Sequence, residues 1–193
     1  MYQRLFVLLA PLALLLGCQT VKVGNLDSPF FAPPKGSTVI LHQNLDIAPQ
    51  TARVFLQRGQ AYRYGGINRY YPWCYFQINT VEDATQELGA DTFEVYRVVS
   101  RTEEVVENQP IRLAGLSSKT AGGILLAYGG GGPPTVTQTV QLWLRSEKKS
   151  DIRKMVCGGA EDNPATVVPP SIIEIKGALG ATATLKLPEQ RGS

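Results

Sequence analysis

The chain contains one histidine, His42, and any Ser–His–Asp or Cys–His catalytic site would have to use it as the base. It falls in a stretch of alternating apolar and polar residues, on the face shared by Ile40, Asn44 and Asp46. The main apolar set lies on the opposite face. We therefore expect a histidine that points to solvent, and we give a catalytic or zinc-binding role less weight.

Other catalytic motifs are weak. Ser146 and Lys149 formally match S-x-x-K, a signature of serine acyl-transferases, but they stand in a charged turn between two expected strands, without an S-D-N or K-T-G companion. The glycine run does not fit the phosphate-binding P-loop pattern. Carboxylates cluster at 82–87 and 103–107 as on a solvated surface, whereas glycoside hydrolysis needs two of them opposed across a cleft. We therefore expect no enzyme activity, no cofactor and no metal site.

The chain has three cysteines: Cys18 at the end of an N-terminal apolar run, and Cys74 and Cys157 in expected strands. If Cys18 is set aside, Cys74 and Cys157 remain. Two such cysteines in an exported chain are most often paired in an oxidising compartment. Closing a loop of about 83 residues would stabilise the fold by roughly 4.5 kcal/mol in the chain-entropy model. The alternatives are a metal site or a reactive thiol, and no cluster of His or Cys supports either.

The segment 62–76 has a high local density of aromatic residues. They are Tyr62, Tyr64, Tyr70, Tyr71, Trp73, Tyr75 and Phe76. Such rings beside arginine can stack on sugars or form a protein-binding surface, so Arg69, Tyr70, Tyr71 and Trp73 are our candidate binding residues. The alternative, to which we give more weight, is that these rings pack the strand around the disulfide. Exposed Trp73 and Tyr75 would favour glycan binding, and buried ones would argue against it.

From Thr38 onward the chain reads as short strands separated by Gly, Pro and Asn, which favours a mainly β, antiparallel sandwich or barrel. The apolar residues that share strand faces are Val39, Leu41, Leu45 and Ile47; Val54 and Leu56; Cys74, Phe76 and Ile78; and Val136, Val140, Leu142 and Leu144. Further strands are expected over 93–99 and 152–157.

One or two short helices are also expected. Thr80 to Asp83 resembles a capping box, with Gly89 as a C-terminal stop. Ser171 and Glu174 match the S-x-x-E box, and a helix starting there would end at Gly180.

Residues 115–135 interrupt this pattern with Gly129 to Gly132 followed by Pro133 and Pro134. Four consecutive glycines cost much backbone entropy to order. We expect a mobile loop or an extended hairpin here. The alternative is a loop that contacts a partner and becomes ordered on binding.

The N-terminus has the organisation of a secretory signal peptide. One positive charge at Arg4 precedes an apolar run from Leu5 to Leu16, which is too short to span a bilayer. The run ends in Leu-Leu-Gly-Cys18, which resembles the lipobox of bacterial lipoproteins. That resemblance implies removal of residues 1–17 and attachment of diacylglycerol and a fatty acid such as palmitate to Cys18.

Two or more acyl chains hold a protein stably in a membrane. In bacterial lipoproteins an Asp directly after the lipidated cysteine is a signal for retention in the inner membrane, and this chain has Gln19 at that position. The resemblance therefore implies the periplasmic leaflet of the outer membrane in a Gram-negative host. Residues 18–37, rich in Pro and Gly, read as a lipidated cysteine and flexible tether, and residues 38–193 as one periplasmic β-rich domain.

Composition limits the partners further. The 193 residues carry a formal net charge of +3, and the basic residues form no dense run, so we do not expect a nucleic-acid partner.

The stretch Asn68 to Cys74, with Asp91 to Phe93 and Cys157, resembles uncharacterised proteobacterial envelope lipoproteins of unknown role. That resemblance supports the pairing of Cys74 with Cys157 and implies no activity.

From the sequence we therefore expect a non-catalytic accessory or scaffolding lipoprotein that binds an envelope protein. The alternative is a module that binds glycan or peptidoglycan through the segment 62–76.

Overall fold

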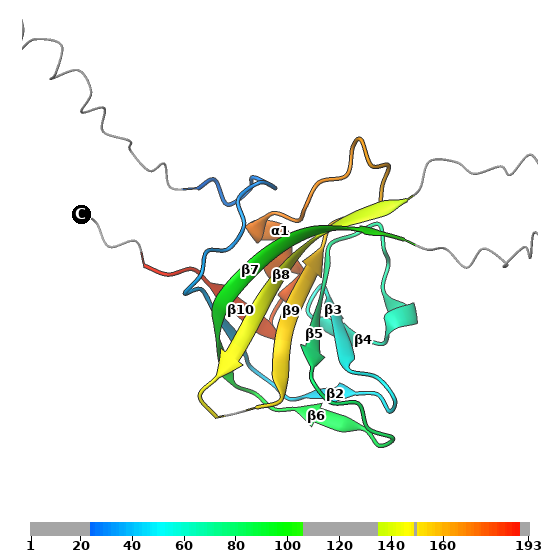
Figure 1. Cartoon of the computed structure of the whole chain (residues 1–193), viewed down its shortest axis with the longest axis vertical. Coiled ribbons are helices and arrows are strands. Elements are labelled where there is room, and N and C mark those ends of the chain that lie inside the picture. The colour runs from blue at the N-terminus through cyan, green and yellow to red at the C-terminus, as the bar shows by residue number, and fades with distance from the viewer. Residues whose placement is uncertain (1–23, 106–134, 149, 190–193) are drawn as a thin grey trace, which may run out of the picture.

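The computed structural model describes residues 24–105, 135–148 and 150–189. They form a β-rich domain in which a large antiparallel sheet curls into half a barrel beside one short α-helix (Figure 1). This confirms the predicted fold class. The predicted signal peptide, Cys18 and most of the glycine-rich stretch 115–135 lie outside the described residues.

The strands are β1 (Thr38–Leu41), β2 (Leu45–Ile47), β3 (Arg53–Gln57), β4 (Gln60–Tyr62), β5 (Trp73–Ile78), β6 (Gln86–Leu88), β7 (Thr92–Glu104), β8 (Val136–Ser146), β9 (Ile152–Gly158) and β10 (Ala183–Lys186). Eight of them form the large sheet in the order β10-β1-β7-β8-β9-β5-β3-β4. Strands β2 and β6 form a separate two-stranded sheet. The helices are α1 (Ile172–Leu179) and a 3-10 turn, η2 (Tyr64–Gly66).

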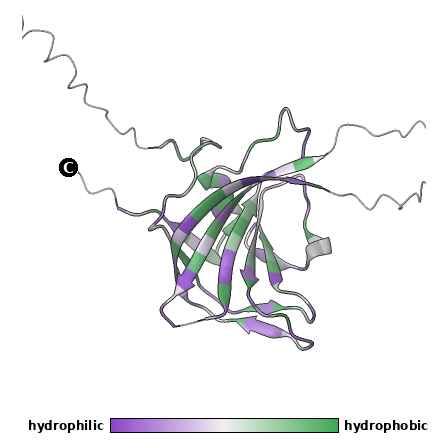
Figure 2. Ribbon diagram, in the orientation of Figure 1, coloured by the Kyte–Doolittle hydropathy of each residue, from purple (hydrophilic) through white to green (hydrophobic). Residues whose placement is uncertain are grey.

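The main core lies between one face of the large sheet and α1. The helix buries Ile172, Ile175, Ala178 and Leu179 and packs on β3, β5 and β10. Figure 2 shows hydrophobic and hydrophilic segments alternating along the strands, as expected where one face of a strand packs on a core. The apolar strand faces predicted from the sequence all point into buried positions.

The helix begins and ends where its capping residues predict. Ser171 Oγ accepts a hydrogen bond from the Glu174 amide at 3.2 Å, and a Glu174 carboxylate oxygen accepts one from the Ser171 amide at 2.8 Å. At the other end, Gly180 has a φ of 55°, and a Cβ there would lie 2.5 Å from the Cα of Gly59 in the β3–β4 turn. Only glycine fits this contact between the helix end and the hairpin.

The second expected helix, over 80–89, was wrong. Residues 86–88 instead form β6, which pairs with β2. Thr80 does not cap a helix, because its hydroxyl and amide both donate to the carboxylate of Asp151 in the β8–β9 turn. Long-range hydrogen bonds therefore override the local capping pattern.

The predicted tether overlaps the folded domain. Leu26, Phe31 and Ala32 pack against the main core, and the Leu26 carbonyl accepts a hydrogen bond from the Ile173 amide at 3.3 Å. The amide of Gly36 donates to the carbonyl of Val95 at 2.9 Å. Residues 26–37 therefore lie on the domain. None of the helices within the described ranges is long and apolar enough to cross a membrane.

Cys74 and Cys157 are joined in a disulfide, which confirms the predicted pair. They are directly opposite partners on the neighbouring strands β5 and β9. Both side chains are fully buried in the main core. The bond therefore fixes the register of two central strands.

Candidate functional site

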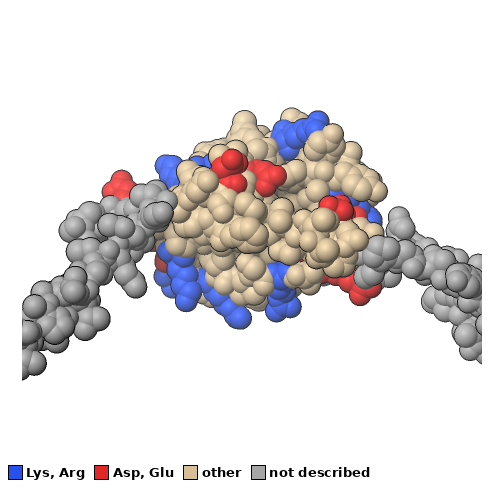
Figure 3. Space-filling model, turned by 90° about the horizontal axis from the view of Figure 1, so that it is seen from above, with Lys and Arg blue, Asp and Glu red and all other residues tan. Residues whose placement is uncertain are grey.

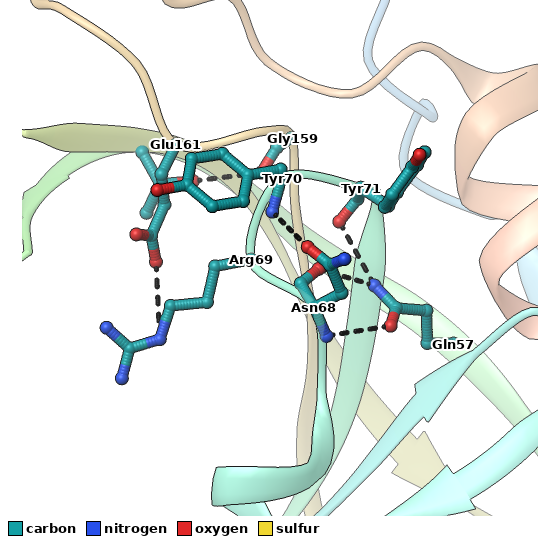
Figure 4. A network of polar contacts seen from close by, with 8 residues as sticks. Gln57, Asn68, Arg69, Tyr70, Tyr71, Gly159 and Glu161 are labelled. Carbon is teal, nitrogen blue, oxygen red and sulfur yellow. Dashed lines mark hydrogen bonds and ion pairs between the residues drawn. The ribbon is translucent and has the colours of Figure 1, made fainter.

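The loop between β4 and β5 carries most of the candidate binding residues, and a buried glutamine holds it in place. Gln57, at the end of β3, is 7% exposed. Its Nε2 donates to the carbonyls of Asn68 at 2.8 Å and Tyr71 at 3.2 Å. Its Oε1 accepts from the Asn68 amide at 3.0 Å. Figure 4 shows this amide contacting the loop backbone at Asn68 and at Tyr71.

The loop also folds on its own residues. The side-chain Oδ1 of Asn68 accepts from the Tyr70 amide at 3.0 Å, and the Asn68 carbonyl accepts from the Tyr71 amide at 3.2 Å. This local turn is typical of asparagine. The loop is further joined to the segment after β9, because the Glu161 amide donates to the Arg69 carbonyl at 3.0 Å and the Glu161 carboxylate lies 3.7 Å from Arg69 Nε.

The rings of Tyr70 and Tyr71 project from this loop. They are 74% and 48% exposed. The guanidinium of Arg58, in the β3–β4 turn, lies 4.6 Å from the centre of the Tyr71 ring and supports it by a cation–π contact. Arg69, Tyr70 and Tyr71 are consecutive residues of this loop, and we call them the tyrosine loop.

Trp73 is not part of the tyrosine loop, although we grouped it with these residues in the sequence. Its side chain is 7% exposed and lies flat over the sheet at Gly158, where a Cβ would fall 2.4 Å from the indole. It stacks on Tyr75 with ring centres 5.9 Å apart and an interplanar angle of 9°. Together with Phe55 and Val156 it forms a second, smaller core on the outer face of the sheet, the face away from α1.

Tyr75 is likewise buried, and burial raises the pKa of its hydroxyl above the ordinary value. The rings of Trp73 and Tyr75 thus pack the strand, as the alternative interpretation proposed. They do not present a flat aromatic strip to solvent.

A groove of about 930 Å³ lies between β2 and the β3–β4 hairpin and reaches the start of the β4–β5 loop at Arg63 and Gly65, but Arg69, Tyr70 and Tyr71 do not line it. Its walls include Asp46, Arg53, Phe55, Tyr62 and Arg63. Strand β4 is the last strand of the large sheet, and its three residues are exposed. An exposed sheet edge beside a groove is a common place for another polypeptide to dock.

His42 lies in a different groove, of about 1040 Å³, together with Asp91, Ser146 and Lys148. Its Nε2 is 2.7 Å from the hydroxyl of Thr184 on β10. The Ser146 hydroxyl instead donates to the Asp91 carboxylate, and Lys148 Nζ lies 3.5 Å from the other oxygen of that carboxylate.

These contacts do not activate Ser146 as a nucleophile. Partial burial raises the pKa of Asp91, but hydrogen bonds from Ser146 and Thr92 and the charge of Lys148 outweigh it, so the net pKa is lowered. A carboxylate with a lowered pKa is a weak base for removing a proton from a hydroxyl. Within the described part of the chain, no three His, Cys, Asp or Glu side chains are grouped as a metal site.

Two positioning residues, Gln57 and Glu161, could not be found from the sequence. Gln57 occupies a polar position in an alternating strand and reads as solvent-facing, and Glu161 lies far from the aromatic segment along the chain. Comparison of the chain with models of protein families, with curated proteins and with solved structures finds no match.

Proposed function

We propose that this protein is a lipid-anchored, non-catalytic accessory protein of the cell envelope, which binds another envelope protein through the tyrosine loop. The observation that carries the proposal is the exposure of Tyr70 and Tyr71 on a loop that Gln57 holds by its backbone. Because the backbone is held independently of the two rings, the fold does not need them buried.

Such a loop is suited to binding. Tyrosine supplies a large contact area with few rotatable bonds, so little side-chain entropy is lost when it is covered. A loop already held in its bound shape also avoids the cost of ordering on association. The β4–β5 loop starts at the exposed β4 edge, where Arg63 lines the groove, so a large partner would find further contact there.

A protein partner is favoured over a glycan by the burial of Trp73 and Tyr75. Sugar-binding surfaces use flat aromatic rings that stack against the sugar, and the most extended flat pair in this segment is stacked inside the outer-face core. The contacts of His42 with Thr184 and of Ser146 with Asp91 support a non-catalytic role.

The anchor rests on Cys18 and its resemblance to a lipobox. Because the chain packs on the domain from Leu26 onward, residues 19–25 would separate the lipid from the domain. Seven extended residues reach at most about 25 Å, so the domain would stay close to the membrane. We propose the periplasmic leaflet of the outer membrane.

The anchor is tested by labelling cells with an alkyne analogue of palmitate. We expect label on the wild-type protein and none on Cys18→Ala. Gln19→Asp should keep the label and move the protein from the outer-membrane to the inner-membrane fraction. Label that persists on Cys18→Ala would contradict the proposed anchor.

Binding is tested by crosslinking the protein in living cells and identifying captured proteins by mass spectrometry. We expect one dominant envelope protein, reduced at least tenfold by Tyr70→Ala/Tyr71→Ala. Tyr96→Ala is the matched control, because Tyr96 is a 43% exposed tyrosine on β7. Equal capture by both variants would argue against the tyrosine loop, and capture of peptidoglycan fragments alone would support the glycan-binding alternative.

A further inference from the structure

A row of cationic and aromatic side chains crosses the outer face of the sheet. The directly opposite partners on five adjacent strands are Arg97 (β7), Trp143 (β8), Lys154 (β9), Gln77 (β5) and Arg53 (β3). Residues paired in this way project on the same side of a sheet. The row therefore places three cations in line, although they are far apart in the sequence.

Trp143 is the centre of this arrangement. Its ring centre lies 5.6 Å from the guanidinium of Arg97, 5.4 Å from that of Arg153 and 5.4 Å from Lys154 Nζ. At the other end of the row, the guanidinium of Arg53 lies 4.9 Å from the centre of the Tyr75 ring. We call Arg53, Arg97, Arg153 and Lys154 the basic patch. Figure 3 shows several Lys and Arg side chains along the lower border of the view and others scattered along the remaining borders.

The charge of the basic patch is not neutralised within the described residues. The ion pairs there join Arg69 to Glu161, Arg145 to Glu94 and Lys148 to Asp91, and none involves the patch. Lys154 Nζ donates to the neutral Gln141 Oε1 at 2.9 Å, and Gln141 in turn donates to Glu103 at 3.1 Å. Glu103 thus reaches the patch through an amide and offsets only part of its charge.

The groups of the patch also act on one another electrostatically. Burial lowers the pKa of Lys154, the charges of Arg153, Arg53 and Arg101 lower it further, and Glu103 opposes them. Gathering like charges in this way costs stability. An anion bound at the patch would remove that cost.

Two buried polar atoms in the same row have no hydrogen-bond partner among the described residues. They are Trp143 Nε1, a donor, and Gln77 Oε1, an acceptor. A buried polar atom without a partner is costly and calls for an explanation. A ligand oxygen that approached the row could accept from the indole of Trp143 while it paired with the guanidinium groups.

We propose that the basic patch binds a polypeptide segment rich in Asp and Glu. Guanidinium groups bind carboxylates in a planar, two-point geometry. Arg97, Lys154 and Arg53 stand on alternate strands, so successive cations are about 10 Å apart and suit an extended polyanion better than a single small ion. The choice of a protein partner rests on the proposed function.

A membrane lipid is less suited to the patch. The tether residue Leu26 contacts the start of α1, on the core side of the sheet, whereas the basic patch is on the outer face. A short tether on one face of the sheet does not favour contact of the other face with the same membrane.

The test uses the full-length protein in nonionic detergent and fluorescently labelled poly-L-glutamate, with poly-L-glutamine as the neutral probe. We expect the protein to bind poly-L-glutamate and not poly-L-glutamine. The double variant Arg97→Gln/Arg153→Gln should weaken the binding of poly-L-glutamate at least tenfold. It should also weaken when NaCl is raised from about 50 to 300 mM, because surface charges are screened by salt. The charge-matched control, Lys176→Gln/Lys186→Gln, removes two exposed cations from α1 and β10 and should change affinity less than twofold.

Equal weakening by both double variants, or no binding of poly-L-glutamate, would overturn the proposal. Binding to phosphatidylglycerol vesicles that depends on Arg97 and Arg153, without poly-L-glutamate binding, would assign the patch to lipid and would also overturn it. Tyr70→Ala/Tyr71→Ala should leave poly-L-glutamate binding unchanged. A failure of the tyrosine loop is therefore separable from a failure of the basic patch.

Discussion

At the scale of single residues, Gln57 links the sheet to the surface. One side-chain amide satisfies the backbone groups of Asn68 and Tyr71 in the β4–β5 loop while it is itself buried. The two tyrosines therefore keep their position without contributing to the core. The cost of removing this amide should appear both in stability and in binding.

Replacing Gln57 by Leu should destabilise the fold by about 2 kcal/mol, because the Asn68 amide and two carbonyls lose their buried partner. Urea unfolding followed by circular dichroism measures the change. Gln60→Leu in β4 is the control, since that side chain is exposed and its loss should cost less than about 0.5 kcal/mol. A Gln57→Leu protein as stable as the control would show that the amide does not hold the loop.

Asp151 gives a prediction of pH dependence. Partial burial raises the pKa of its carboxyl, but hydrogen bonds from Thr80 and Asn79 outweigh it, and the net pKa lies below the ordinary value. A carboxylate with a lowered pKa in the folded state stabilises the protein above its unfolded pKa, about 3.9, and loses that effect as the pH falls through the folded value.

Asp151→Asn should therefore cost about 1 kcal/mol at pH 7 and progressively less below about pH 4. Urea unfolding of both proteins at pH 7, 5, 4 and 3 measures the difference. Asp83→Asn, at an exposed aspartate in the neighbouring loop, is the control and should track the wild type. A difference that is constant down to pH 3 would contradict the role given to the charge.

The candidate residues were partly predictable. Aromatic density identified Tyr70 and Tyr71, because composition alone marks an unusual concentration of rings. It also included Trp73, which the structure buries. The alternation of apolar and polar residues could not show that Trp73 is buried. Trp73 packs against Gly158, on a strand that is distant in sequence, and both faces of β5 are covered.

At the scale of elements, the disulfide joins two central strands. Cys74 and Cys157 close a loop of 83 residues between β5 and β9. In the chain-entropy model a loop of this length restricts the unfolded chain strongly. The bond also lies in the main core, so its loss would leave two buried thiols or a small cavity.

Cys74→Ala/Cys157→Ala should lower the free energy of unfolding by about 2–5 kcal/mol. Urea unfolding with and without a reductant measures it. The wild type should lose a similar amount on reduction, and the double variant should not respond to the reductant. A wild type whose stability is the same in both conditions would contradict the expected contribution of the bond.

The two helix predictions show what local patterns can decide. The box at Ser171 was correct because its residues satisfy each other within one turn of α1. The similar box at Thr80 was wrong because Thr80 bonds to Asp151 and residues 86–88 pair with β2. A capping pattern specifies a helix start only where no distant partner competes for the same groups.

At the scale of the whole molecule, the sheet collects charges that the sequence scatters. Arg53, Arg97, Arg153 and Lys154 form no run, and the net charge of +3 is small. The strand order β7-β8-β9-β5-β3 nevertheless brings them together on one face of the sheet, three of them in one row and Arg153 beside it. A charge pattern of this kind depends on register, which hydrophobic alternation alone does not determine across strands so distant along the chain.

We propose a domain held near a membrane with two binding surfaces, the tyrosine loop and the basic patch. The central proposal is that the tyrosine loop contacts a protein partner. Solvent exposure and a pre-organised backbone support that claim, and direct contact in the cell would test it.

The most direct measurement is photo-crosslinking in living cells with benzoylphenylalanine at position 70. Position 96, another exposed tyrosine, serves as the matched comparison. We expect one crosslinked envelope protein from position 70, lost when Gln57 is replaced by Leu, and no such product from position 96. No product at position 70, or the same product from both positions, would contradict the account.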